Sequence, residues 1–201
     1  MSIAAVLCDL GGVAVDVNAD QLVHQVSQVL HRPFDQVQQA VYHPELLVPF
    51  ELGRITPEEY YAGLRRRLPT LPWGYDQFVA AWNSFFLENR DVTGLLARLR
   101  RRHRLVALSN TNVLHIGYLR GHLPSLACFH DWVASCEVGL RKPDPEIYRV
   151  ALARAGVEAP AAVYIDDRPE LVEAGQALGL RAIRFESCRQ LEAELAKVQA
   201  L

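Results

Sequence analysis

The sequence lacks the features that mark secreted, membrane-spanning and zinc-binding proteins. Its 201 residues include four cysteines, which are scattered without a Cys-x-x-Cys pair or a His/Cys cluster at zinc-ligand spacing. No apolar stretch reaches the length of about 18 residues that a membrane span needs. No basic segment precedes the first apolar run, so a signal peptide is not expected. We therefore predict a soluble, cytoplasmic protein with no membrane partner, whose cysteines act as small hydrophobic residues in a reducing compartment.

An excess of charge is also missing. The formal net charge is -2, which gives no reason to expect nucleic acid or an acidic membrane surface as a partner. Five arginines within residues 98–104 form a basic run, but they lie at the end of a predicted helix, where cations interact favourably with the helix dipole. We therefore expect no nucleic-acid partner.

What the chain does contain is a regular alternation of apolar strands and amphipathic helices. Half of the residues are hydrophobic, enough for a sizeable core. Five short apolar runs are predicted to be buried strands: residues 3–8, 105–108, 132–135, 161–165 and 181–185. Helical patterns lie between most of them, so the fold class is α/β with a parallel sheet and right-handed crossovers.

One interval is too long for a simple crossover. Residues 9–104 separate the first two predicted strands, and they contain four further helical patterns, at residues 20–30, 34–42, 57–68 and 75–87. Thr56 followed by Pro57 and two glutamates is typical of a helix start. We predict a core of residues 1–17 and 90–201 and an inserted helical cap of residues 18–89, above the carboxyl edge of the sheet.

Polar side chains follow the ends of several predicted strands. Asp9 ends the first, and Gly11 and Gly12 permit a tight turn there, so Asp9 suits a nucleophile or a cation ligand as well as a turn cap. Ser109 and Asn110 follow the second strand, where a hydroxyl and free N–H groups suit phosphate, or an ordinary helix cap.

Two charged segments follow later strands. Lys142 precedes a proline-started helix and can either neutralise a phosphoryl group or remain a solvated loop cation. Asp166 and Asp167 directly follow the fourth strand, and two adjacent carboxylates there are hard to explain without a cation. Since all of these segments fall at the same edge of a parallel sheet, they fit phosphoryl transfer through an aspartyl-phosphate with Mg²⁺.

These segments, in this order, resemble the haloacid dehalogenase (HAD) superfamily, and the helical insert resembles its C1 cap. The resemblance covers residues 3–185. It implies a Rossmann-like three-layer sandwich with a five-stranded parallel sheet in the order 5-4-1-2-3. The segments around Asp9, Ser109 and Lys142 are most similar to a branch acting on small sugar phosphates, including the α-glucose-1-phosphate phosphatase type.

The resemblance also implies residue roles. Asp9 would be the nucleophile, Ser109 and the Asn110 backbone amide would bind the phosphoryl group, and Lys142 would bridge nucleophile and phosphate. The Mg²⁺ ligands would be Asp9, Asp167 and the Gly11 carbonyl, with Asp166 beside the ion or acting through water.

Gly11 departs from the family pattern. Most phosphatases of the superfamily carry an acid–base aspartate two residues after the nucleophile, and such help is worth roughly 10²–10⁴ in rate. Three explanations stay open: the leaving group needs little help, another residue substitutes, or turnover is poor. The candidate substitutes are Asp16, His43, Glu45, Glu51 and His115. The resembled branch also has glycine here and contains active phosphatases, which favours the first two.

The predicted function is Mg²⁺-dependent hydrolysis of a small phosphomonoester, such as a sugar phosphate, by a monomer or homodimer whose partner is a small phosphorylated metabolite. One alternative is a 2-haloacid dehalogenase, in which the aspartate attacks carbon without a metal, although the Asp166-Asp167 pair would repel a haloacid carboxylate. The other is a weakly active or non-catalytic protein that binds phosphate ligands, suggested by Gly11. A phosphomutase is a weaker option, because mutases depend on the missing aspartate.

Overall fold

The computed structural model describes residues 2–201; Met1, at which the predicted core begins, lies outside the described residues. Five parallel strands form the central sheet in the order β5-β4-β1-β6-β7. Counted along the chain and followed from β7 to β5, this is the predicted order 5-4-1-2-3. Each strand lies within a residue or two of its predicted run: β1 (Ala5–Cys8), β4 (Arg104–Ser109), β5 (Asp131–Ala134), β6 (Ala162–Asp166) and β7 (Arg181–Arg184).

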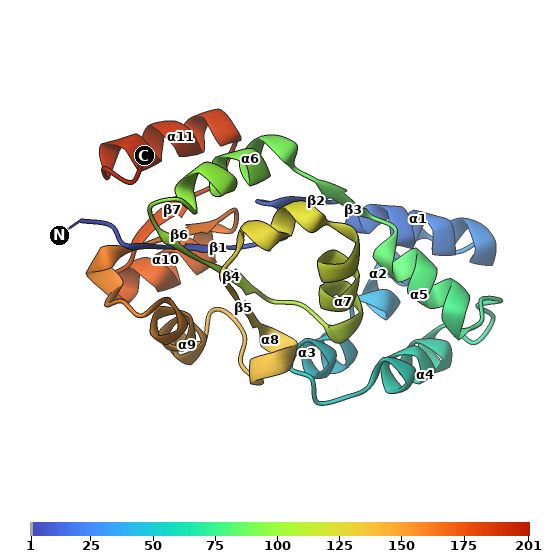
Figure 1. Ribbon diagram of the computed structural model, residues 1–201. Helices are drawn as coiled ribbons and strands as arrows, with labels where there is room; N and C mark the ends of the chain where they lie inside the picture. The colour runs from blue at the N-terminus through green and yellow to red at the C-terminus, as the bar shows by residue number, and fades with distance from the viewer. Residues whose placement is uncertain (1) are drawn as a thin grey trace.

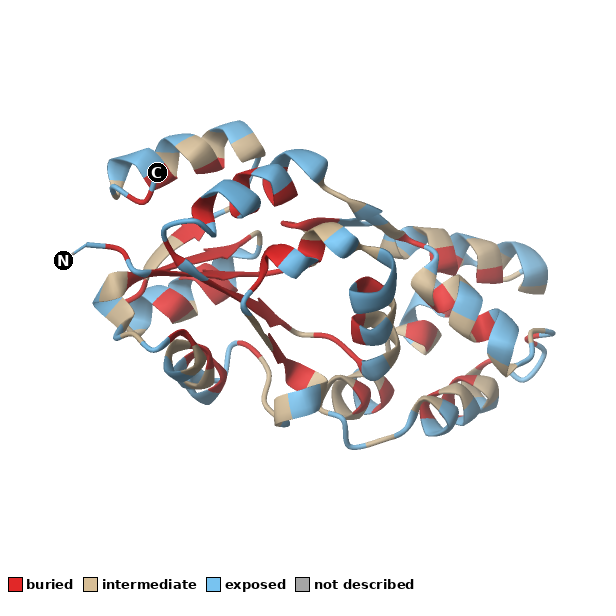
Figure 2. Ribbon diagram, viewed as in Figure 1, coloured by how far each residue is buried: buried red, intermediate tan, exposed pale blue. Residues whose placement is uncertain are grey.

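Helices cover both faces of this sheet. Because strand residues alternate in direction, Val6 and Cys8 pack into one hydrophobic cluster, whereas Ala5 and Leu7 pack into another. In Figure 2 the inner strands β1, β4 and β6 are accordingly almost wholly buried, and the outer faces of the helices are largely exposed. The first cluster includes α6 (Arg90–Leu99), α7 (Val113–His122), the 3-10 helix Pro124–Cys128 and α11 (Cys188–Lys197); the second includes α9 (Pro145–Ala155), flanked by α10 (Pro169–Ala177) and the 3-10 helix Ala159–Ala161. This is the predicted α/β three-layer sandwich.

A second group of helices lies beyond the carboxyl ends of the strands, in the right-hand half of Figure 1. These cap helices are α1 (Ala19–Leu30), α2 (Phe34–Val41), α3 (Pro44–Glu51), α4 (Pro57–Arg67) and α5 (Tyr75–Asn83). They enclose a hydrophobic cluster of their own, in which Trp82 contacts Phe50, Tyr60 and Phe78. The division of the chain into a core and a cap at residues 18–89 stays a proposal.

The start of α4 is the helix start expected from the sequence. The Thr56 hydroxyl accepts a hydrogen bond from the Glu59 amide at 3.2 Å, and the Thr56 amide donates to the Glu59 carboxylate at 2.8 Å. Pro57 occupies the first helical position, where its missing N–H costs nothing.

The predicted helix at residues 75–87 is wrong at its C-terminal end. Helix α5 ends at Asn83, and β3 (Phe86–Glu88) pairs antiparallel with β2 (Val15–Val17), with Val17 opposite Phe86. Hydrogen bonds from the Asn18 amide to the Phe85 carbonyl and from the Asn89 amide to the Ala14 carbonyl extend this pairing. Tertiary pairing thus overrides the local helical pattern, and the resulting two-stranded ribbon joins the core to the cap helices.

Some helices were not predicted at all. Helix α3 begins with His43 as its N-cap and Pro44 at the first position, but Pro49 inside it disguises the helical pattern. Helix α8 (Ser135–Val138) is a single turn that begins at the last residue of a predicted strand. Ser135 therefore belongs to a helix start and not to β5.

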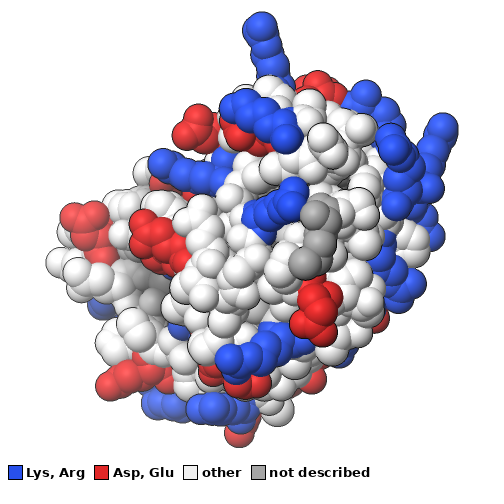
Figure 3. Space-filling view, turned by 90° about the vertical axis from the view of Figure 1, so that its left-hand side faces the viewer, with Lys and Arg blue, Asp and Glu red and all other residues white. Residues whose placement is uncertain are grey.

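The arginine run before β4 serves the surface of the core. Arg98 pairs with Glu192, and Arg100 donates to the carbonyl groups of Ala127 and Cys128. On the side of the molecule seen in Figure 3, basic and acidic side chains are interspersed. Within residues 2–201, no helix is both long enough and apolar enough to cross a membrane.

Candidate active site

Asp9 directly follows β1 at the carboxyl edge of the sheet. Its amide donates to the Ile165 carbonyl at 2.9 Å, and its carboxylate Oδ1 accepts from the Leu10 amide at 2.7 Å. The other carboxylate oxygen, Oδ2, lies 3.0 Å from Nζ of Lys142. The side chain is therefore held by backbone and charge contacts with one face toward a cavity.

Three carboxylates meet here. Asp9, Asp166 and Asp167 each offer an oxygen, and these oxygens all lie within 4.8 Å of one another. Burial raises the pKa of Asp9 to about 7, against the lowering effect of Lys142 and with a further rise from Asp166. Burial and the charge of Asp166 also raise the pKa of Asp167. Such crowded, buried, hard oxygen donors fit a hard divalent cation.

Asp166 and Asp167 differ in what they contact. Oδ2 of Asp166 lies 2.6 Å from Nζ of Lys142 and also accepts a hydrogen bond from the Tyr164 hydroxyl, while its Oδ1 accepts from the Arg168 amide at 3.0 Å. The Asp167 carboxylate instead lines the cavity. Asp166 thus fixes the buried lysine, and Asp167 is the member of the pair that is open to a ligand. Tyr164 was not anticipated from the sequence, where it reads as an ordinary strand residue.

Lys142 is buried and its backbone is clamped by a second segment. The Asn110 side chain donates from Nδ2 to the Lys142 carbonyl at 2.9 Å and accepts at Oδ1 from the Lys142 amide at 2.8 Å. The sequence interpretation considered only the backbone amide of Asn110. Its side chain has a separate role, which is to connect the strand end of β4 to the lysine loop.

The loop after β4 is also fixed from the other side. The Thr111 amide donates to Oγ of Ser135 at 2.9 Å, and the Ser135 hydroxyl donates back to the Thr111 carbonyl at 2.9 Å. Asn112 then caps α7 by accepting from the His115 amide at 3.1 Å. The sequence analysis did not identify Ser135 as a site residue. The one feature that could have indicated it is a hydroxyl side chain at the end of the predicted strand at residues 132–135.

Gly12 allows Asp167 to approach the first loop. Its φ is 78°, in the left-handed region, and a Cβ built on it would lie 2.5 Å from Oδ2 of Asp167. A side chain at this position would therefore be strained and would displace the carboxylate.

These groups open into a cavity of about 510 Å³ between the core and the cap helices. From the core it is lined by Asp9, Gly11, Ser109, Asn110, Asp167 and Arg168, and from the cap side by Tyr42, Leu47, Glu51, Trp82 and Phe85. The wall facing the carboxylates is thus mainly apolar and aromatic, with one acidic side chain.

The structure separates the candidate acid–base residues. Of the five, Glu51 and His115 line the cavity. Asp16 accepts a hydrogen bond from Asn89 in the ribbon, and Glu45 is exposed and paired with Arg67 at 3.1 Å.

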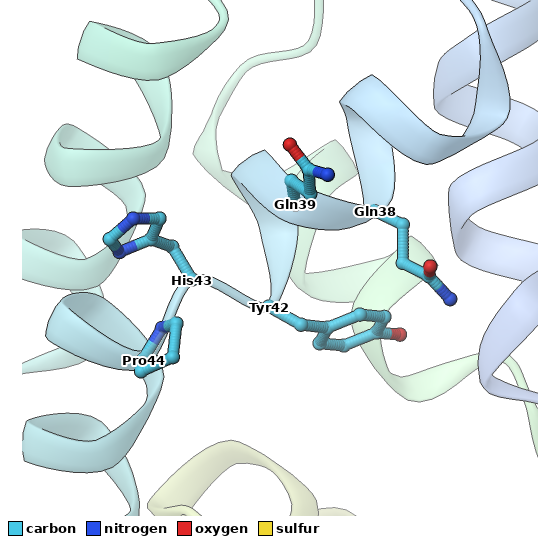
Figure 4. A pocket seen from close by; sticks show the side chains of 5 residues that line it. All are labelled: Gln38, Gln39, Tyr42, His43 and Pro44. Carbon is cyan, nitrogen blue, oxygen red and sulfur yellow. The ribbon is translucent and has the colours of Figure 1, made fainter.

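His43 lies at a different hollow, of about 470 Å³, between α2 and α3. Figure 4 shows the Tyr42 ring turned away from His43 and Pro44, so the side chains that line this hollow do not converge. No carboxylate is among its lining residues within the described chain. This hollow does not fit the chemistry of the carboxylate cluster.

His115 is committed to contacts between the core and the cap helices. Its ring stacks on Trp82 at 5.1 Å between centroids, with Nε2 placed 3.1 Å from the Trp82 carbonyl oxygen and Nδ1 placed 3.1 Å from the side-chain Nδ2 of Asn112. Burial lowers the pKa of His115 to about 3. The imidazole is therefore neutral near pH 7, and both of its nitrogens are engaged.

Comparison with known proteins gives the site its context. The D-ribitol-5-phosphate phosphatase of Bacteroides thetaiotaomicron is 22% identical over an alignment of 212 positions, which covers 96% of this chain and 97% of that protein. The drimenol cyclase of Aspergillus calidoustus is 25% identical over an alignment of 160 positions, which covers 78% of this chain but only 30% of that protein.

Solved structures show a similarity of fold as well. The crystal structure of an HAD family enzyme from Bacteroides thetaiotaomicron, in complex with magnesium and inorganic phosphate, superimposes with a TM-score of 0.82 at 26% identity and covers 92% of this chain and 95% of that one. Residues 3–179 of the chain match the family described as haloacid dehalogenase-like hydrolase. The chain therefore belongs to the haloacid dehalogenase-like hydrolases.

Proposed function

We propose that this hydrolase is a Mg²⁺-dependent phosphatase that cleaves a small phosphomonoester through an aspartyl-phosphate. The observation that carries the proposal is the convergence of the Asp9 carboxylate, the buried Lys142 ammonium group and the Asp167 carboxylate at one rim of the cavity. The ribitol-phosphate phosphatase relative and the magnesium-phosphate complex of the structural relative support it.

Asp9 is the proposed nucleophile. One carboxylate oxygen attacks phosphorus in line with the departing ester oxygen, and an acyl-phosphate bond forms on Asp9. Lys142, 3.0 Å from Asp9 Oδ2, lies where it can also neutralise the charge of the phosphoryl oxygens. The Ser109 hydroxyl and the Asn110 amide, on the same cavity wall, are proposed to hold those oxygens.

We assign the Mg²⁺ ligands to Asp9, Asp167 and the Gly11 carbonyl, with Asp166 beside them. When bound, the ion supplies positive charge at the phosphoryl oxygens. Asp166 orients Lys142 through their 2.6 Å contact, so the ammonium group keeps its place when charge builds up on the substrate.

The position of the cap helices limits the substrate to a small molecule. They form the cavity wall opposite Asp9, and we propose that they restrict the access of bulk water and of large substrates to the reacting phosphoryl group. We propose a small phosphorylated metabolite, with sugar phosphates as the first candidates, acted on in the cytoplasm by a monomer or homodimer.

The proposal is tested with purified protein, p-nitrophenyl phosphate and a panel of sugar phosphates, nucleotides and acyl phosphates, each with and without Mg²⁺. We expect phosphate release that needs Mg²⁺ and is lost in Asp9→Asn. Binding of phosphate compounds without turnover of any of them would instead identify a binding protein. Release of halide from a 2-haloacid without Mg²⁺ would identify a dehalogenase.

A further inference from the structure

The glycine at position 11 leaves the proposed phosphatase reaction without the usual proton donor. The titratable side chains that line the cavity within residues 2–201 are Asp9, Tyr42, Glu51, His115, Asp167 and Arg168. Asp9 and Asp167 belong to the cation cluster, both nitrogens of His115 are engaged, and Arg168 is paired with Glu170. The Tyr42 hydroxyl donates to the Ala19 carbonyl. Glu51 is the remaining group that can exchange a proton near pH 7.

Glu51 is held by charge, and its hydrogen-bonding capacity is left free. It is the last residue of α3, and its side chain is 15% exposed. Oε2 lies 2.9 Å from Nη2 of Arg141, the residue before Lys142, but the two groups are not aligned as a hydrogen bond, and residues 2–201 provide no hydrogen-bond partner for this buried oxygen. Oε2 is sealed beside Arg141, so Oε1 is the atom of this carboxyl group that can bond to a substrate oxygen.

The backbone fixes where Glu51 lies over the core. Gly53 follows α3 with a φ of 66°, and a Cβ built on it would lie 2.3 Å from the Cys136 carbonyl oxygen in α8. The end of α3 is therefore in close backbone contact with the core, two residues after Glu51. This contact fixes the backbone at the end of α3, from which the Glu51 side chain reaches the cavity wall.

The surroundings of Glu51 favour a carboxyl group that holds a proton more tightly than usual. Burial raises its pKa, and the charges of Arg141, Arg168 and Lys142 lower it in part, so the net shift is upward. Tyr60 and Cys136 also lie near it and interact with its charge. A general acid needs a pKa moved toward the working pH in this direction.

We propose that Glu51 is the general acid and base of this hydrolase, in place of the aspartate absent at Gly11. The proposal rests on the phosphatase function proposed above. In the first step the bond between Asp9 and phosphorus forms and the ester P–O bond breaks. The electron pair of that bond stays on the leaving oxygen, which takes the proton of Glu51 and departs as an alcohol.

In the second step the Glu51 carboxylate takes a proton from water while the water oxygen attacks phosphorus. The bond between phosphorus and Asp9 breaks, and its electrons return to the Asp9 carboxylate. Inorganic phosphate leaves, Glu51 is protonated again, and both residues are ready for another cycle. Atoms and charges balance with water as the sole co-reactant.

The test compares Glu51→Gln with the natural protein on two substrates that differ in leaving group. p-Nitrophenolate is stable enough to depart as an anion. The leaving oxygen of an alkyl phosphate such as glycerol 3-phosphate must instead receive a proton as it departs. We expect kcat/KM on the alkyl phosphate to fall by about 10²-fold or more, and kcat/KM on p-nitrophenyl phosphate to change little. A loss of equal size on both substrates would overturn the proposal, because it would indicate a structural role.

A second measurement isolates the water step. With p-nitrophenyl phosphate, Glu51→Gln should release a rapid burst of about one p-nitrophenolate per active site, followed by slow turnover, since the aspartyl-phosphate then lacks its base. The burst also proves that the variant is folded and that Asp9 still reacts. Steady turnover at the natural rate without a burst would contradict the proposal.

Matched variants complete the design. Glu45→Gln removes one negative charge from the exposed side of α3, so kcat/KM should stay unchanged on both p-nitrophenyl phosphate and the alkyl phosphate. Arg141→Gln removes a cation that lowers the Glu51 pKa, so the alkaline limb of kcat/KM on the alkyl phosphate should move to higher pH; an unmoved limb would count against Glu51. If the natural protein turned over neither substrate with Mg²⁺, the phosphatase function itself would fail, which is a distinct result.

Discussion

The side chain of Asn110 holds the backbone of Lys142 through a reciprocal pair of hydrogen bonds, 2.9 Å from Nδ2 to the carbonyl oxygen and 2.8 Å from the amide to Oδ1. Asn110 directly follows β4, whereas Lys142 lies in the loop between α8 and α9, far along the chain. Lys142 in turn contacts both Asp9 and Asp166. The position of the ammonium group relative to Asp9 therefore depends on an amide that itself carries no charge.

We predict that Asn110→Ala lowers kcat on p-nitrophenyl phosphate by about 10²-fold, because a displaced Lys142 no longer aligns with Asp9. The Asn110 backbone amide, which is the proposed phosphate contact, remains in this variant. Asn110→Asp keeps the acceptor for the Lys142 amide but loses the donor to the Lys142 carbonyl. Its kcat should therefore lie between that of the natural protein and that of Asn110→Ala. Steady-state kinetics with thermal unfolding as a folding control give the answer, and natural kinetics in Asn110→Ala would refute the positioning role.

Gly12→Ala is expected to weaken Mg²⁺ binding. The added Cβ would meet Oδ2 of Asp167 at 2.5 Å, and alanine is strained at a φ of 78°. Titration of Mg²⁺ against activity should show a raised half-saturating concentration, together with a lower unfolding temperature. Gly94→Ala is a suitable control, because no atom lies within 4 Å of a Cβ at that helical position. Equal Mg²⁺ dependence in both variants would mean that Asp167 does not bind the ion.

The raised pKa of Asp9 leads us to predict how the stability of the metal-free protein changes with pH. Its pKa is raised from 3.8 to about 7 by burial, so the folded state binds an extra proton between these values and its stability declines as pH rises through that range. Asp9→Asn removes this contribution. In EDTA, the free energy of unfolding of the variant should be similar to that of the natural protein near pH 4 and should exceed it above pH 7.

Because His115 also titrates, the pH effect of Asp9 has to be measured as the difference in free energy of unfolding between the natural protein and Asp9→Asn. Its pKa is lowered to about 3 by burial, so its own contribution falls as pH drops below 6.5, in the opposite direction. Because both proteins contain His115, subtracting their free energies of unfolding at each pH cancels that contribution. Added Mg²⁺ should stabilise the natural protein above pH 7 more than Asp9→Asn. A difference that does not vary with pH would show that Asp9 ionises normally in the folded state.

The sequence could predict the sheet and the segments at its edge because both depend on local pattern. Each strand is a short apolar run bounded by polar residues, and parallel strands must all present their carboxyl ends at the same edge. Asp9, Ser109 and Asp166 could therefore be placed together without knowing any side-chain direction. The order of the strands followed from the resemblance to a known family and is the observed one.

What the sequence could not predict depends on contacts between side chains that are distant in the chain. The bond of Ser135 to Thr111 and that of Tyr164 to Asp166 require the register of β4 and β5 and the rotamers at β6. The pairing of β2 with β3 is likewise a tertiary choice, since Phe86 fits a helix or a strand equally well by pattern. Selection of Glu51 among five candidate acids needed the position of α3 over the cavity.

Gly11→Asp tests whether the missing acid can be restored. The φ of Gly11 is outside the left-handed region, and a Cβ there would lie 3.3 Å from Cγ2 of Val17, so a side chain fits after a shift of a few tenths of an ångström. Placed in the Glu51→Gln background, the new carboxyl group should recover part of the lost kcat/KM on an alkyl phosphate and leave kcat/KM on p-nitrophenyl phosphate nearly unchanged. Gly11→Asn, which has the same size without a transferable proton, should recover nothing. Equal recovery by asparagine and aspartate would show that the loss in Glu51→Gln comes from packing and not from proton transfer.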